Sequence, residues 1–174
     1  MMTKDTFDYV VEQFADLQIL RYRVLGFEEL SLKQKELIYY LSQAALEGRD
    51  ILFDQNGKYN LQIRHLLEAA YLHFEGDRTT EEFKALEVYL KRVWFASGIH
   101  HHYSCDKFVP GFSESYLKGI LDGLDEALLP LREGESREAM YATLFPVMFD
   151  SSVMPKRVNQ ADGEDLLQTS AANY

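Results

Sequence analysis

The chain has 174 residues, with 28 acidic against 18 basic side chains and a formal net charge of -10. This length suits one domain that folds without disulfides or a structural metal. The excess of carboxylates, with no dense run of Lys and Arg, argues against nucleic acid and anionic membranes as partners. No apolar stretch approaches the ~18 residues of a membrane span, and Cys105 is the only cysteine, so we expect a soluble protein of the cytoplasm.

Apolar residues recur at three- and four-residue steps along most of the chain, which predicts an all-α fold of about six amphipathic helices in an irregular bundle. The first predicted helix ends near Gly26 and carries Phe7, Val10, Val11, Phe14, Leu17 and Val24. The second begins at a capping box, Ser31 to Gln34, and continues to about Phe53. Gly48 lies on its apolar stripe, where the helix either packs closely against another element or bends. We favour a continuous helix.

Four further helices follow. The third has the inward stripe Ile63, Leu66, Leu67, Ala70, Tyr71 and Phe74, and Gly76 is its predicted C-terminal cap. The fourth starts at Thr80 and has the inward set Phe83, Leu86, Leu90, Val93 and Trp94. The fifth starts at Ser113, is broken by Pro130, and carries Leu117, Ile120, Leu121, Leu124 and Leu128. In the sixth, Pro146 should kink or end a stripe of Met140, Leu144, Val147 and Met148.

The helical pattern fades after residue 150. We therefore predict that residues 1–150 form one helical part and that 151–174 are a connector or a truncated tail, because this stretch mixes turn residues with short apolar pairs.

The segment 98–112 is the most unusual part of the sequence, since it holds three of the five histidines and the only cysteine. His100 to His102 are residue types that bind zinc, nickel or copper, but their spacing is poor for one ion, and no His-Glu-x-x-His motif is present. Cys105 lacks the glycine-rich surroundings of a cysteine hydrolase, so a buried or incidental thiol is expected. His65 and His73 lie too far apart on one helix to bind one metal ion together without a third element, and we expect them at the surface or at its boundary with the core.

Four stretches resemble a known family. They are YVVEQFADLQILRY at 9–22, LIYYLSQAALEGRDIL at 37–52, SGIHHHYSCDKFVP at 97–110 and DGED at 162–165. Together they look like the N-terminal part of bacterial dipeptidyl-peptidase III. Members of that family are two-lobed zinc exopeptidases that release dipeptides from the N-termini of oligopeptides.

The resemblance implies a parent enzyme in which zinc-bound water attacks the peptide carbonyl. The family's zinc motif, His-Glu-x-x-Gly-His or a longer variant, does not occur in this chain. The resemblance therefore implies an inactive, non-catalytic piece with no metal of its own, whose tail leads into a β-barrel. Its partners would be the rest of its own chain and, in the parent, peptide substrates, with self-association through an exposed face. Export of the parent before processing is left open.

The only segment that matches a family motif is 98–110, in which His102, Tyr103, Asp106 and Lys107 are candidates for hydrogen bonds to a peptide substrate. An alternative is that Asp106 and Lys107 only pin the loop to the next helix. A second function class also remains open: a free-standing helical interaction domain, responsive to metal through His100 to His102.

Overall fold

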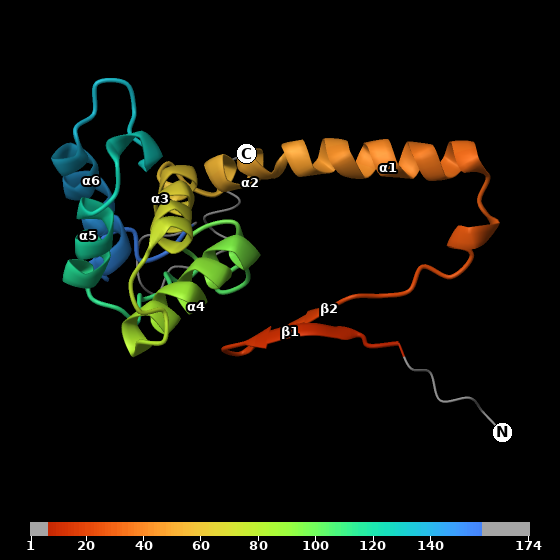
Figure 1. The fold of residues 1–174 in the computed structure, drawn as a ribbon, viewed down its shortest axis with the longest axis horizontal. Coiled ribbons are helices and arrows are strands. Elements are labelled where there is room, and N and C mark those ends of the chain that lie inside the picture. The colour runs from red at the N-terminus through yellow and green to blue at the C-terminus, as the bar shows by residue number, and fades with distance from the viewer. Residues whose placement is uncertain (1–6, 158–174) are drawn as a thin grey trace, which may run out of the picture. The chain divides into compact units, whose positions relative to one another are not determined.

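The computed structural model describes residues 7–157, which are mostly helical with one small two-stranded sheet (Figure 1). The chain divides into two compact units, Met1–Gly48 and Arg49–Tyr174. No helix among the described residues is both long and apolar enough to cross a membrane. The elements follow in the order β1 (Val10–Phe14), β2 (Leu17–Leu20), η1 (Phe27–Glu29), α1 (Leu32–Glu47), α2 (Arg49–Asn56), α3 (Asn60–His73), α4 (Glu81–Ala96), α5 (Glu114–Asp122), η2 (Glu126–Leu128) and α6 (Arg137–Phe149).

The first unit begins with an antiparallel hairpin, so the prediction of a helix over residues 7–26 and of an all-α fold is wrong here. Phe14 pairs with Leu17 across a turn in which Ala15 has a φ of 47°. Phe14, Leu17 and Ile19 lie on one face of the hairpin and are half-buried. Steps of three or four residues between apolar side chains fit this arrangement as well as a helix, because the hairpin brings positions from two strands onto one face.

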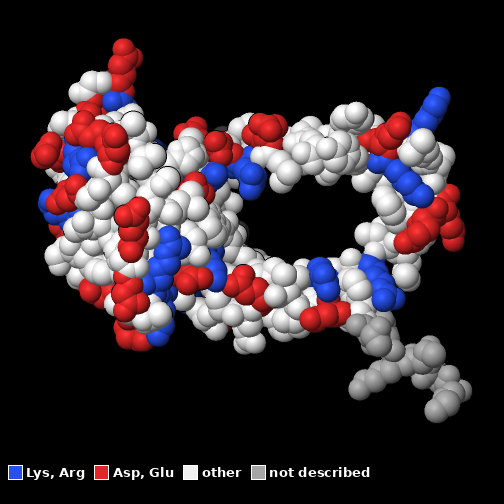
Figure 2. Space-filling model, viewed as in Figure 1, with Lys and Arg blue, Asp and Glu red and all other residues white. Residues whose placement is uncertain are grey.

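The helix α1 starts where its capping box predicts. The Ser31 hydroxyl accepts from the backbone N–H of Gln34, and the Gln34 side chain accepts from the backbone N–H of Ser31. The helix ends at Glu47, and α2 begins at Arg49, so the prediction of one continuous helix is wrong and the chain breaks at Gly48. No residue of α1 is buried, although its stripe was expected to face a core. In Figure 2 its surface is largely uncharged between charged groups near its ends.

In the second unit, α2 to α6 surround one hydrophobic core. The predicted inward stripes of the third to sixth helices supply most of it. The residues that are almost fully excluded from solvent are Ile63, Leu66, Leu67, Leu86, Leu90, Val93, Leu117, Leu121, Met140 and Leu144. Trp94 and Leu128, also predicted to face inward, are instead exposed by 41% each.

Two arginine side chains hydrogen-bond to carbonyl groups at the ends of α3 and α5, and the sequence pattern did not predict either interaction. Helix α3 ends at His73 with Phe74 extended, not at a glycine cap, and the guanidinium of Arg78 donates to the carbonyl oxygens of Leu72 and Phe74. Cationic side chains commonly satisfy the last carbonyls of a helix in this way. Helix α5 ends at Asp122, shorter than predicted, and Arg137 donates to the carbonyls of Leu121, Asp122 and Leu124.

Helix α6 continues for three residues past Pro146 and ends at Phe149. The chain then turns back, and Val153 and Met154 pack against the core. The described part of the predicted tail, 151–157, is therefore attached to the second unit, while 158–174 lie outside the described residues. The assignment of the tail as a connector remains a prediction.

Candidate functional site

The histidine segment forms a closed loop between α4 and α5 and is tied to the chain after α6. His100 pairs with Lys107 as an isolated antiparallel bridge, and Asp106 pairs in the same way with Lys156. Between them, the backbone N–H of Cys105 donates to the carbonyl of His101 at 3.0 Å. Cys105 has a φ of 62°, in the left-handed region that non-glycine residues seldom adopt. The loop is thus held by backbone bonds at both of its ends.

Lys107 fastens this loop to the end of α6. Its ammonium group donates to the carbonyl oxygens of Val147 at 3.0 Å, of Val153 at 2.7 Å and of Asp150. An ammonium group has three donors, so all three are used within the protein. Burial lowers the pKa of Lys107, and the nearby carboxylate of Asp150 opposes that shift. This arrangement fits a side chain that pins the loop.

His100 is buried and connects the loop to the segment after α6. Its Nε2 lies 2.8 Å from the carbonyl oxygen of Met154. A carbonyl only accepts, so Nε2 carries the proton in the neutral ring. Burial lowers the pKa of His100, the hydrogen bond to Met154 opposes this, and the positive charges of Lys107 and Arg157 lower it further. His100 is therefore a neutral structural histidine at pH 7.

The next two histidines stack on one another. The ring centroids of His101 and His102 are 4.5 Å apart, and the ring of His102 also lies 4.2 Å from that of Tyr103 and 5.1 Å from that of Phe95. Nδ1 of His101 accepts from the backbone N–H groups of Tyr103 and Ser104, both at 3.2 Å. These two hydrogen bonds to Nδ1 stabilise the turn from His101 to Ser104.

The structure separates the four candidate substrate contacts into two kinds. Lys107 is committed to backbone carbonyls and His102 is half-buried in an aromatic stack, whereas Tyr103 and Asp106 are exposed. Tyr103 is the most accessible, with 81% of its surface exposed. The four therefore differ in how far they can reach a substrate, and their role in substrate binding stays a prediction.

Three further residues considered in the sequence are Cys105, His65 and His73. Cys105 is buried, and its sulfur is 3.8 Å from the guanidinium of Arg157. His65 is half-buried and His73 exposed on α3. Within residues 7–157, no group of three His, Cys, Asp or Glu side chains is placed to hold a metal ion.

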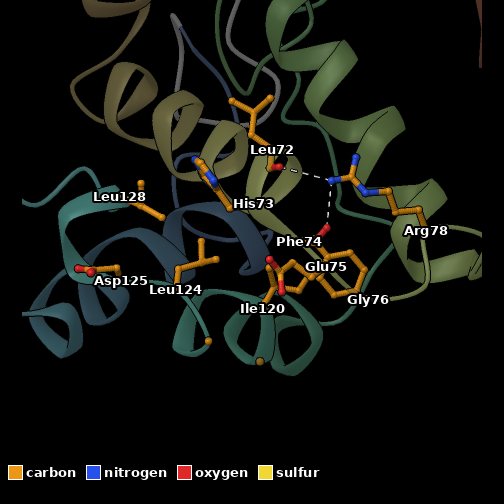
Figure 3. A pocket seen from close by; sticks show the side chains of 12 residues that line it. Leu72, His73, Phe74, Glu75, Gly76, Arg78, Ile120, Leu124, Asp125 and Leu128 are labelled. Atoms are coloured by element: carbon orange, nitrogen blue, oxygen red, sulfur yellow. Dashed lines mark hydrogen bonds between the residues drawn. The ribbon is translucent and has the colours of Figure 1, made fainter.

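A groove that the sequence pattern did not predict lies at the C-terminal end of α3. It has a volume of about 690 Å³ and is lined by Leu72, His73, Phe74, Glu75, Gly76, Arg78, Gly119, Ile120, Gly123, Leu124, Asp125 and Leu128. In Figure 3, Leu124 points from the segment after α5 toward the end of α3, and Arg78 reaches back to the carbonyls of Leu72 and Phe74. The signal in the sequence was the glycine pair at 119 and 123, one helical turn apart on a single face.

No protein-family model matches this sequence, and no curated protein matches it at a significant level. The function must therefore be inferred from the residues and their arrangement.

Proposed function

We propose that this chain is a non-catalytic helical part of a larger zinc-dependent dipeptidyl-peptidase III, and that α1 is packed by other segments of that protein. The resemblance of residues 9–22, 37–52 and 97–110 to that family names the parent. The observation that carries the proposal is that α1 leaves its apolar side chains exposed.

The stretch from Leu37 to Leu46 contains no charged residue, and no residue of α1 is buried. Leu37, Tyr40 and Leu41 are 57%, 68% and 60% exposed. Apolar side chains are found on every side of this helix, and a helix that is apolar all round is normally enclosed by other elements. This supports a larger body that supplies the missing contacts.

The hairpin of the first unit supports the same proposal. Two isolated strands are marginally stable in water, and three or more strands or a covering layer are usually needed. Among the described residues, the sheet contains only β1 and β2. In the parent, further strands or a covering helix would stabilise it, in keeping with the β-barrel that the resemblance implies for this lobe.

Zinc chemistry is assigned to parts of the parent outside this chain. The described residues do not supply a suitable ligand group, and the full sequence has no histidine followed by glutamate. The role that remains for the 97–110 loop is to join α4, α5 and the end of α6, with Tyr103 and Asp106 as the accessible side chains among the four candidates.

The alternative of a metal-responsive interaction domain is less well supported. His100 uses Nε2 for the carbonyl of Met154, and His101 uses Nδ1 for two backbone N–H groups. Binding a metal ion through these nitrogens would break bonds that hold the loop.

The test compares this chain with the product of the complete reading frame that contains it. We expect hydrolysis of a dipeptide naphthylamide, sensitive to chelator, for the complete product and none for residues 1–174. Chelator-sensitive hydrolysis by residues 1–174 would contradict the proposal, as would a complete product without this activity.

The contact of the loop with substrate is tested in the complete product by Tyr103→Ala. Val109→Ala is a matched control, because Val109 lies in the same loop and is 74% exposed. We expect Tyr103→Ala to raise KM without lowering Tm and Val109→Ala to change neither. Unchanged kinetics in both variants would remove the substrate role from this loop.

A further inference from the structure

We propose that the groove between the end of α3 and the α5–η2 segment binds a helical segment of a partner protein, apolar on one face and carrying lysine or arginine. This inference does not depend on the peptidase proposal, because the second unit alone supplies every residue that lines the groove.

Two glycines keep the groove open. Gly119 lies inside α5, and a Cβ atom at this position would meet no other atom within 4 Å. At Gly123 a Cβ would make only ordinary contacts, the nearest being the carbonyl oxygen of Ile120 at 3.4 Å. Neither glycine has a positive φ, so the backbone does not require glycine at either place. What their missing side chains provide is a shallow track along α5 into which the ridge of another helix fits.

The rim of the groove carries large apolar side chains in contact with solvent. Leu72 is 65% exposed and Leu128 41% exposed, and they belong to the α3 and η2 sides respectively. Ile120 and Leu124 line the same hollow between them. An occupant with aliphatic side chains would remove this apolar surface from water, which favours binding.

The charged side chains that line the groove favour one kind of occupant. Glu75 and Asp125 are exposed carboxylates that line the groove. Arg78, the only Lys or Arg in the lining, is engaged by the carbonyls of Leu72 and Phe74, and its guanidinium lies over the rings of Tyr71 and Phe83. Arg78 is exposed and keeps its positive charge, so the lining has two carboxylates against one guanidinium. This net negative charge favours a cationic segment and disfavours the phosphates of a nucleic acid or lipid surface.

The test uses the full chain, labelled with ¹⁵N, and an acetylated helical peptide of leucine, alanine and lysine with its leucines on one face. We expect saturable shifts centred on the amides of Gly119, Ile120 and Gly123. A peptide with glutamate in place of lysine should bind at least about tenfold more weakly.

Variants locate the binding. Gly119→Leu fills the groove from a position with free space and should weaken binding at least about tenfold while leaving the circular dichroism spectrum unchanged. Ala139→Leu adds the same side chain at an exposed position of α6 outside the groove and should bind like the unchanged chain. Equal binding by Gly119→Leu, equal affinity for the glutamate peptide, shifts confined to α1, or no saturable shift would each overturn the proposal.

Discussion

The ammonium group of Lys107 donates to the carbonyl oxygen of Val153 at 2.7 Å, joining the histidine loop to the segment that follows α6. The two residues are 46 positions apart in sequence. Together with the bonds from Lys107 to Val147 and Asp150, this contact makes the loop and the end of α6 one connected structure.

Lys107→Met keeps most of the apolar stem and removes the ammonium group. It leaves three carbonyls without their donor, and we expect the free energy of unfolding to fall by about 1–3 kcal/mol, measured by urea denaturation. Lys118→Met is the control, because Lys118 forms an exposed pair with Asp122 on α5. That change should cost no more than about 1 kcal/mol. Equal losses in the two variants would contradict the structural role of Lys107.

Acidification should destabilise the protein through His100. Because burial lowers its folded-state pKa, the unfolded chain binds the proton first as the pH falls. The contribution is therefore complete above the ordinary pKa of about 6.5 and is lost as the pH falls below it. We expect the free energy of unfolding to decrease as the pH falls below about 6.5, and His100→Gln to reduce this slope. His73→Gln, at an exposed position, should keep the slope, and an unchanged slope in His100→Gln would show that other groups cause it.

Two glycines should respond oppositely to alanine. Gly119→Ala adds a methyl group into open space within a helix, so the free energy of unfolding should rise by about 0.5–1 kcal/mol. At Gly98, φ is 154° and a Cβ would overlap the side-chain amide of Asn60, whose oxygen accepts from the N–H of Ile99 at 3.2 Å. Gly98→Ala should therefore destabilise the protein by more than about 1 kcal/mol. Thermal melting of both variants checks the pair, and a gain at Gly98 would show that Asn60 moves without cost.

Replacement of an apolar residue in α1 should have little effect on this chain. Leu41 is 60% exposed, so Leu41→Gln should change the free energy of unfolding by less than about 0.5 kcal/mol. Leu66→Ala in the core should cost about 2–5 kcal/mol. A large loss for Leu41→Gln would mean that α1 is already packed within this chain, which would count against the proposed function.

Part of the fold could be predicted because its signals are local. A hydroxyl at Ser31, Thr80 or Ser113 accepts from an N–H three residues later, and in each case a helix begins there. The stripes of α3 and α4 have the helical period and face the core. The hairpin was not predicted because the spacing of its apolar residues fits both a helix and a pair of strands. In addition, the turn at Ala15 has no glycine or asparagine to mark it.

The candidate sites also combine features that local sequence indicates with contacts that only folding creates. The sequence drew attention to the 98–112 loop, but composition does not reveal that Lys107 reaches residues 40 to 46 positions away. The groove beside α5 depends on residues from 72 to 128 that meet only after folding.

The sequence by itself determined where α1, α4 and α5 begin and which faces of α3 to α6 are largely buried, because caps and periodicity act within a few residues. Only the tertiary structure decided that residues 10–20 pair as strands, that α1 buries none of its apolar side chains, and that Lys107 and Arg78 use their donors on backbone carbonyls. These features depend on which distant groups compete for the same hydrogen bonds and apolar surface, and sequence spacing does not contain that information.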